Sequence, residues 1–228
     1  NQPVFLKFYH TGSWRSKAYR LAIQSVFYLR LQRLFFRSEA VDMQRNSGAF
    51  INLEHNDWAL FTGTPGPNNK AVLFDGRHFY KIGPGSEAMD ILGNEASVLG
   101  EIAEKNIGGF VVPSANLLND RVLQLEDVSE GTMRATIFSP LHLNVVSALN
   151  SATAQEVLPA ETALWQQTKR LLNELATDSD ERIPAGMLRK LAVLMALSSQ
   201  SKANWALAHG DFTPWNMFLE KGELFVFD

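Results

Sequence analysis

The 228-residue sequence contains no cysteine, which excludes disulfide bonds and metal sites built on thiolates. The absence of cysteine fits a reducing compartment, and we expect a cytoplasmic protein. No uninterrupted apolar stretch approaches the length of about 18 residues that a membrane-spanning helix needs, so none is predicted. Internal repeats and low-complexity segments are also missing.

The composition is that of an ordinary folded protein. Hydrophobic residues make up 46% of the chain, charged residues 20% and aromatic residues 11%. This is enough apolar material for a sizeable core in one large domain or two small ones. The chain begins on Asn1 without a methionine and ends on a candidate metal ligand, Asp228. We therefore expect it to be a trimmed piece of a longer protein.

Acidic residues are missing from the first 38 positions, which carry seven lysines or arginines. The remaining residues carry 14 basic and 24 acidic side chains, a balance of −10. Three interpretations stay open. The basic, aromatic segment packs its apolar side on the acidic body, which we favour, or makes peripheral contact with the inner face of an anionic membrane through residues 14–37. Binding to nucleic acid is the least favoured, and no nucleic-acid partner is predicted.

Hydrophobic periodicity predicts an α+β fold with a small strand-rich lobe followed by a mainly helical lobe. Helices are expected over residues 16–37, 87–105, 155–176 and 185–200, and a polar linker over 38–56. Strands are expected over 58–61, 71–74, 77–82, 111–118, 122–125 and 224–228. A cleft between two such lobes is a natural place for a nucleotide.

The C-terminal segment carries the clearest chemical pattern. Asp211 follows His209 by two residues, Asn216 follows Asp211 by five, and an apolar strand then ends on Asp228. Phosphoryl transfer needs a carboxylate that receives or orients a hydroxyl proton, and oxygen ligands for Mg²⁺ on the phosphates. The order matches the catalytic and metal-binding loops of the protein-kinase-like fold. It predicts Asp211 as the catalytic base, and Asn216 and Asp228 as ligands of Mg²⁺.

Lys81 lies in the middle of an expected strand, where a lysine is costly to cover unless its ammonium has a partner. The helix that follows offers one, because Glu95 falls on its apolar stripe and buried acids are generally paired. A strand lysine held by an inward-facing helix glutamate is the pair that aligns a lysine on nucleotide phosphates. The alternative is that Lys81 reaches solvent at the edge of the sheet.

A turn-rich loop over residues 63–69 joins two expected strands just before Lys81. Its residues Gly63, Thr64 and Gly66 are predicted to bring backbone N–H groups close to phosphate oxygens, since glycine allows close approach. Two prolines in the loop remove two donors, so it offers fewer contacts than a fully glycine-rich loop. No Gly-Lys-Ser/Thr triplet is present, which excludes a phosphate loop of that type.

With these residues, the chain resembles the aminoglycoside phosphotransferase and choline-kinase-like family, relatives of the protein kinases. The resemblance is specific only in the run that begins at His209, where Gly210 stands in place of the arginine usual in protein kinases. It implies a kinase-like N-lobe over residues 58–128 and the first part of a truncated C-lobe over 129–228. A basic helical extension with its linker, residues 1–57, lies before both.

The resemblance also implies a function. The stretch from Leu123 to Val128 is similar to the hinge between the lobes, so Leu125 and Asp127 are expected at the adenine of ATP or GTP. The implied reaction is Mg²⁺-dependent phosphorylation of a hydroxyl on an amino sugar, sugar or amino alcohol. Thr213 stands where many protein kinases carry a lysine, which argues against a protein substrate. The alternative is a kinase-like module that binds nucleotide and scaffolds or regulates without transfer.

Overall fold

The computed structural model describes residues 3–9, 13–37, 58–63, 70–177, 183–184 and 186–227. The fold is mixed α+β, as expected from the sequence. The chain divides into two compact units, one made of Asn1–Asn144 with Asp211–Asp228 and the other of Val145–Gly210. The linker expected over 38–56 lies outside the described residues. No helix in the described part of the chain is long and apolar enough to cross a membrane.

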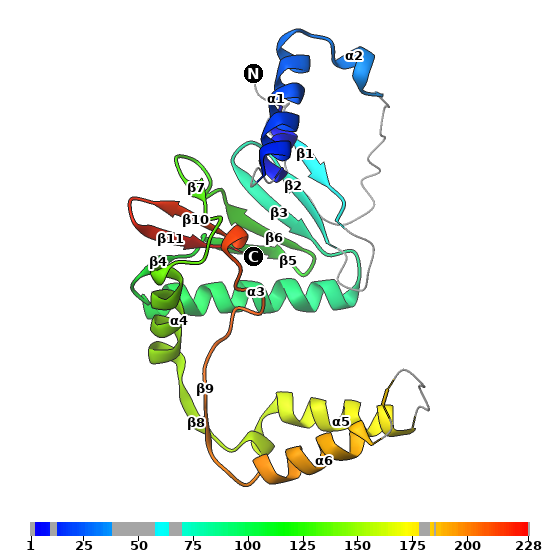
Figure 1. The fold of residues 1–228 in the computed structure, drawn as a ribbon, viewed down its shortest axis with the longest axis vertical. Helices are drawn as coiled ribbons and strands as arrows, with labels where there is room; N and C mark the ends of the chain where they lie inside the picture. The colour runs from blue at the N-terminus through cyan, green and yellow to red at the C-terminus, as the bar shows by residue number, and fades with distance from the viewer. Residues whose placement is uncertain are drawn as a thin grey trace. The chain divides into compact units, whose positions relative to one another are not determined.

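A five-stranded antiparallel sheet forms the centre of the larger unit (Figure 1). Its strands in spatial order are β1 (Ala59–Phe61), β2 (Ala71–Phe74), β3 (His78–Ile82), β6 (Val122–Glu126) and β5 (Ala115–Asn119). β6 pairs with β3 along its whole length, so the chain that leaves β6 starts beside the beginning of β3. The strands predicted over 58–61, 71–74, 77–82 and 122–125 are confirmed to within one residue at each end.

The strand predicted over 111–118 is wrong as a single element. It divides into β4 (Phe110–Val111) and β5, and the two belong to different sheets. Pro113 lies between them, and a proline has no N–H with which to continue a ladder of hydrogen bonds. β4 pairs instead with β11, a strand more than a hundred residues later in the chain.

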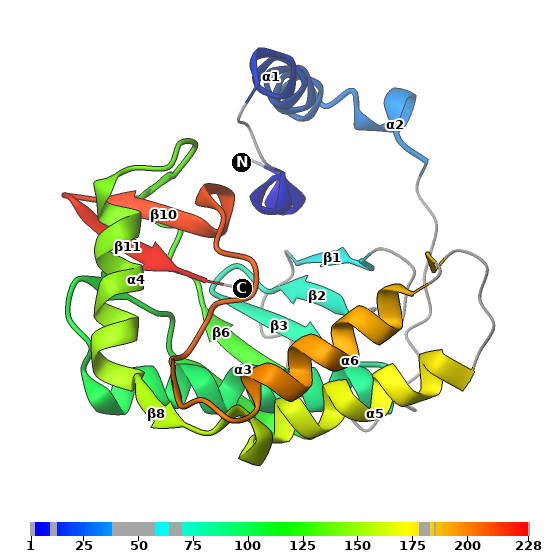
Figure 2. The same ribbon diagram turned by 60° about the horizontal axis from the view of Figure 1, so that its bottom comes forward.

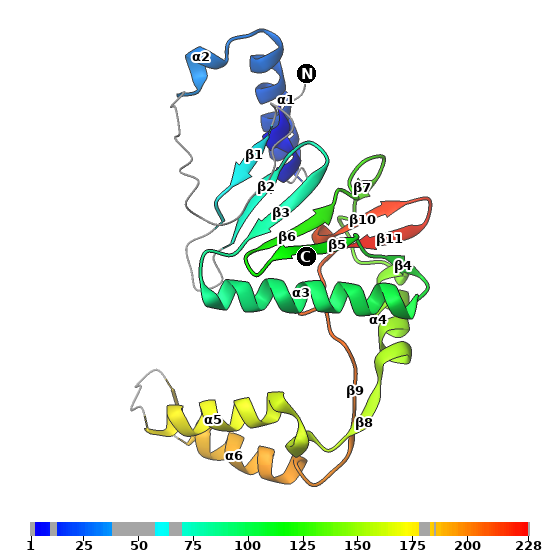
Figure 3. The same cartoon turned by 180° about the vertical axis from the view of Figure 1, so that it is seen from behind.

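The helix α3 (Ser86–Lys105) covers one face of the five-stranded sheet, and Figure 3, the view from behind, shows it beneath the strands. Leu92 of α3 is fully buried and packs with Leu123 and Leu125 of β6. Side chains alternate along β3, so Phe79 and Lys81 lie on the face that α3 covers. Tyr80 takes the opposite face, where a second small core forms.

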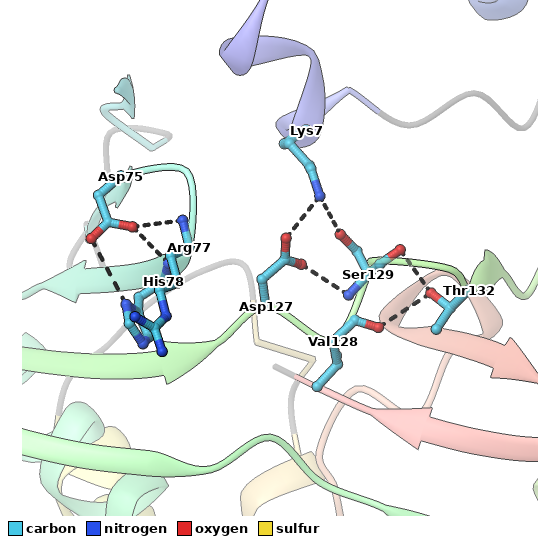
Figure 4. A network of polar contacts seen from close by, with 8 residues as sticks. All are labelled: Lys7, Asp75, Arg77, His78, Asp127, Val128, Ser129 and Thr132. Atoms are coloured by element: carbon cyan, nitrogen blue, oxygen red, sulfur yellow. Dashed lines mark hydrogen bonds and ion pairs between the residues drawn. The ribbon is translucent and has the colours of Figure 1, made fainter. Parts of the chain in front are cut away.

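Asp75 builds the turn between β2 and β3. Its carboxylate accepts hydrogen bonds from the backbone N–H groups of Arg77 (2.8 Å) and His78 (2.7 Å) and from the Tyr80 hydroxyl (2.9 Å); the contacts to Arg77 and His78 are drawn in Figure 4. Gly76 in the turn has a φ of 96°, which favours glycine. Burial by itself raises the pKa of Asp75, but the hydrogen bonds outweigh burial, and the pKa lies below its usual 3.8.

Replacing this carboxylate should therefore have a pH-dependent effect on stability. Asp75→Ala leaves two partly buried backbone N–H groups and the buried Tyr80 hydroxyl without this acceptor, and we expect it to lower the free energy of unfolding by about 2–3 kcal/mol at neutral pH. The folded pKa lies below the unfolded value, so the wild-type advantage is complete above about pH 4 and shrinks as pH falls through the folded pKa. Urea unfolding across this range measures it, with the exposed turn residue in Asp120→Ala as control. A pH-independent difference would contradict the role given to the ionised carboxylate.

A second, four-stranded sheet lies in the same unit, with strands in the order β4, β11 (Glu223–Val226), β10 (Met217–Glu220) and β7 (Met133–Arg134). The strand predicted over 224–228 corresponds to β11, which ends at Val226 and pairs with β10 in a hairpin. Lys221 and Gly222 form its two-residue turn with φ values of 49° and 87°. Two positive φ values are the mark of the type I′ turn that matches the twist of a hairpin.

The helix predicted over 16–37 is interrupted. It forms α1 (Trp14–Tyr28) and a short α2 (Gln32–Phe35). Arg30 adopts a left-handed conformation with a φ of 56°, and its N–H donates to the Phe27 carbonyl while the Leu31 N–H donates to the Val26 carbonyl. This pair of bonds is a Schellman ending, which normally uses glycine. Without a glycine to mark it, the end of α1 could not be located in the sequence.

The smaller unit is built around two helices, α5 (Ala163–Thr177) and α6 (Met187–Ser198). The helix predicted over 185–200 is confirmed to within two residues, but the one predicted over 155–176 begins too early. Its first residues form β8 (Gln155–Val157), paired with β9 (Ala203–Trp205), and then a 3-10 turn, η2 (Pro159–Glu161). A further helix, α4 (Pro140–Thr153), begins in the larger unit and was not predicted.

Candidate active site

Lys81 and Glu95 form an ion pair in the larger unit. The Lys81 ammonium donates to Glu95 Oε1 at 2.6 Å, and the two side chains are only 7% and 16% exposed. β3 brings the lysine and α3 the glutamate, so the pair joins the sheet to the helix that covers it. Removal of one member would leave a charge almost without water, which is strongly unfavourable. The pairing expected from the sequence is present.

Next to this pair lies a cavity of about 370 Å³, within the range of small-molecule sites. Its walls come from both sheets, from the segment after β6, and from the N-terminal turn η1 (Val4–Phe8). The lining residues that matter below are Lys7, Phe8, Gly63, Lys70, Val72, Phe79, Lys81, Leu125, Asp127, Ser129, Arg134, Asn216, Phe218 and Phe227. All belong to one compact unit.

The cavity combines apolar walls with an excess of positive charge. Four cations line it, Lys7, Lys70, Lys81 and Arg134, against two carboxylates. The Arg134 guanidinium lies over the rings of Phe218 and Phe227, at 5.2 and 5.5 Å from their centroids. Burial lowers the pKa of Arg134, but an arginine in a protein keeps its charge. A flat or apolar ligand group with a strongly anionic part would fit such a site.

The C-terminal run folds as a tight loop that ends in a short turn, η3 (Pro214–Asn216). The Asn216 side-chain nitrogen donates to Asp211 Oδ2 at 3.0 Å and to the Asp211 carbonyl at 3.2 Å. Gly210 has a φ of 77°, a conformation that favours glycine at the entry to the loop. The Phe227 N–H donates to the Asn216 carbonyl at 3.1 Å, so the chain leaving β11 meets this loop.

The aromatic side chain of Phe212 anchors this loop to α4. The Phe212 ring packs edge-on against the buried His142 of α4, with ring centroids 6.2 Å apart, and against Phe138 at 6.4 Å. His142 Nδ1 in turn contacts the Ser139 hydroxyl at 2.9 Å. His142 is one of five histidines in the chain, and nothing in its sequence spacing points to this contact.

The structure brings several of the predicted site residues together. Lys81, Leu125, Asp127, Gly63 and Asn216 all line the cavity. Glu95 is not among the lining residues but holds the Lys81 ammonium through their ion pair. Asp211 is an exposed residue beside Asn216 and is not among the lining residues.

Three of the predicted site residues, Thr64, Gly66 and Asp228, lie outside the described residues. No group of three or more His, Asp or Glu side chains that could hold a metal ion occurs within the described ranges. The predicted Mg²⁺ ligands are Asn216 and Asp228, and the position of the second is not described.

Sequence reasoning missed the part of the site that η1 supplies. The Lys7 ammonium donates to Asp127 Oδ2 at 2.7 Å and to the Ser129 hydroxyl at 2.9 Å (Figure 4). Phe8 packs against Phe61 and Phe79 of the sheet, with ring centroids about 6 Å apart. Lys7 and Asp127 are 120 residues apart, so no local pattern could pair them. Only the contrast between a basic start and an acidic remainder pointed in this direction.

The hydrogen bonds at Asp127 determine its charge state. Burial raises the pKa of Asp127, but the bonds from Lys7 and Ser129 outweigh burial and hold the pKa below its usual 3.8. Asp127 therefore stays ionised at neutral pH, and its attraction for Lys7 keeps η1 against the cavity.

Lys7→Ala should loosen η1 without unfolding the unit. The Lys7 side chain is 39% exposed, so solvent weakens the ion pair and its contribution is about 1 kcal/mol. We expect the Leu6 amide of η1 to exchange with solvent deuterium about fivefold faster. Lys105→Ala, which breaks a surface pair with Glu101 on α3, is the matched control and should leave η1 unchanged. Equal exchange of Leu6 in wild type and Lys7→Ala would contradict this anchoring.

Comparison with known proteins adds no further support. No protein-family model, curated protein or solved structure matches the chain.

Proposed function

We propose that this chain is a Mg²⁺-dependent phosphotransferase with a two-lobed, protein-kinase-like fold. It transfers the γ-phosphoryl group of ATP or GTP to a hydroxyl of a small molecule, an amino sugar, sugar or amino alcohol. The observation that carries the proposal is the buried Lys81–Glu95 pair at the wall of a cavity that Asn216 also lines. A strand lysine held by a helix glutamate, together with a loop asparagine, is among the parts that phosphoryl transfer uses in the protein-kinase-like fold.

The walls of the cavity match the two halves of a nucleotide. Val72, Phe79 and Leu125 offer apolar surface to a base, and the segment after β6 borders the same cavity with backbone and side-chain polar groups at Asp127. The triphosphate would then extend toward Lys81, whose ammonium Glu95 holds in place. Lysine and arginine charges elsewhere in the lining add to the attraction for phosphate.

Asn216 is suited to hold a metal ion. Its side-chain nitrogen is the donor in both bonds to Asp211, so Oδ1, the atom that a hard cation needs, takes no part in them. Asp228 would supply the second protein ligand. A bound Mg²⁺ would supply positive charge that stabilises the charge developing on the phosphates during transfer.

Asp211 would act on the acceptor. The hydroxyl oxygen of the acceptor forms a bond to the γ-phosphorus while the bond from that phosphorus to the β,γ-bridging oxygen breaks, and the electron pair leaves with the nucleoside diphosphate. The hydroxyl proton passes to the Asp211 carboxylate. Its exposure gives an acceptor access to it from solvent, and the bond from Asn216 fixes its orientation.

A second candidate is a nucleotide-binding module that scaffolds or regulates without transfer. The observation in its favour is that Asp211 does not line the cavity. The presence of the full set of lysine, glutamate, asparagine and aspartates argues for the enzyme.

A transfer assay separates the two. The chain is incubated with ATP labelled at the γ-phosphate, Mg²⁺ and a panel of amino sugars, sugars and amino alcohols. If the chain is the enzyme, an acceptor becomes labelled only when Mg²⁺ is present, and the labelling falls by about 10²–10⁴-fold in Asp211→Asn. The module predicts Mg²⁺-dependent nucleotide binding with no labelled acceptor. Neither binding nor transfer would overturn both proposals.

A further inference from the structure

The outer face of α1 carries a stripe of large apolar side chains. Trp14, Leu21 and Tyr28 recur every seven residues and are between 65% and 86% exposed. Residues seven positions apart lie on one side of a helix, so the three form a single stripe. Leu34 and Phe35 of α2, the helix that follows α1, are also well exposed.

The inner face of α1 is already used for packing. Ile23 is buried, and Phe27 packs edge-on against Phe5 of η1 with ring centroids 5.9 Å apart. Tyr19 packs on Tyr9 at 5.1 Å. Figure 2 shows α1 above η1 and the sheet, with α2 beyond it. The stripe therefore lies on the side of α1 away from its contacts and is not part of this unit's core.

The charges around the stripe are of one sign. Residues 13–37 contain six lysines or arginines and no acid. Within the described residues, Arg15, Lys17, Arg30 and Arg33 form no ion pair. Lys7 differs from these four residues, because its charge is neutralised by an ion pair with Asp127. Lys7 thus pairs with an acid of the same unit, whereas Arg15, Lys17, Arg30 and Arg33 remain available to another partner.

Exposed apolar residues alone would not identify that partner, as the smaller unit shows. Leu164 of α5 and Leu197 of α6 are also exposed. Residues 163–198 nevertheless carry five basic and four acidic side chains, nearly a balance. Unlike these helices, the described α1–α2 surface combines exposed Trp, Tyr, Phe and Leu with a cation excess, which is the composition of helices that lie on anionic bilayers.

We propose that the α1–α2 surface, formed by Trp14, Leu21, Tyr28, Leu34 and Phe35 with the cations Arg15, Lys17, Arg30 and Arg33, docks on an anionic lipid surface. The aromatic and aliphatic side chains lie at the level of the headgroups, and the cations face lipid phosphates. The surface does not include the nucleotide cavity, so this inference is independent of the proposed function.

Sedimentation with lipid vesicles tests the inference. The chain is mixed with vesicles of phosphatidylcholine alone, and of equal amounts of phosphatidylcholine and phosphatidylglycerol. We expect it to sediment with the anionic vesicles only, and less as salt is raised. Lys17→Gln/Arg33→Gln should weaken binding about tenfold or more, since each cation near an anionic surface contributes several-fold. Trp14→Ala/Leu34→Ala should weaken binding to a similar extent, since binding also scales with the apolar area that is buried. All four side chains are exposed, so unfolding midpoints should match wild type.

Matched changes in the smaller unit are the controls. Lys169→Gln/Lys190→Gln and Leu164→Ala/Leu197→Ala remove the same kinds of exposed side chains from α5 and α6 and should leave binding within about twofold. Equal binding to neutral vesicles, no binding to either kind, or equal losses in control and α1–α2 variants would overturn the inference. Binding to nucleic acid in place of vesicles, or a lipid-free dimer that the α1–α2 variants dissociate, would overturn it as well.

Discussion

Glu95→Ala is expected to lower the free energy of unfolding by about 3–4 kcal/mol, because it leaves the Lys81 ammonium buried without its carboxylate. Apolar residues of similar size in place of both partners remove that penalty. We therefore expect Lys81→Met/Glu95→Leu to recover most of the lost stability while it abolishes the nucleotide site. Urea unfolding of the wild type and the variants measures the effect, analysed as a double-mutant cycle.

The matched control for this pair is Lys105→Ala, which removes one partner of an exposed pair on the same helix. It should change stability by less than about 0.5 kcal/mol. If Glu95→Ala were equally mild, the ion pair with Glu95 would not be the element that fixes Lys81 beside the cavity.

Asp211→Asn is expected to reduce phosphoryl transfer by about 10²–10⁴-fold, the usual contribution of a positioned acid or base. Asparagine has the same size and can still accept the hydrogen bond from Asn216, but it cannot take up the acceptor's proton. Nucleotide affinity should stay within about threefold of wild type, because Asp211 does not line the cavity. Steady-state rates with a responsive acceptor, together with nucleotide titration, measure the two quantities.

Asp120→Asn, a change of the same kind in the exposed turn between β5 and β6, serves as the control and should leave transfer intact. Transfer in Asp211→Asn at the wild-type rate would remove Asp211 from the chemistry. Loss of transfer together with loss of nucleotide binding would instead indicate that the substitution disturbs the loop as a whole.

Elements whose pattern is local were predictable from the sequence. β2, β3, β6 and α3 follow from alternation or helical periodicity and from the Asp75 turn, and their ends agree to within one residue. The division at Pro113 was missed because β4 is specified by its partner β11, which no short window contains. The end of α1 was missed because Arg30 takes the left-handed position that a glycine would have marked.

The candidate site likewise has parts that follow from local sequence patterns and parts that depend on distant segments of the chain. Lys81 and Glu95 are 14 residues apart on a strand and the helix that follows, so their meeting could be inferred from two local patterns. The wall contributed by Lys7 and Phe8 could not, since it depends on how the first residues of the chain return to the segment after β6. Arg134 was also missed, because its position over two phenylalanine rings depends on the pairing of β7 with β10.

Calorimetric titration with ATP in the presence and absence of Mg²⁺ tests the central claim most directly, that Lys81 faces a triphosphate in this cavity. The account predicts one saturable site that requires Mg²⁺ and is at least about tenfold weaker in Lys81→Met, because a hydrogen bond between charged groups is lost. Lys105→Met should bind like wild type. Equal affinity in wild type and Lys81→Met, or no heat of binding in the wild type, would contradict the account.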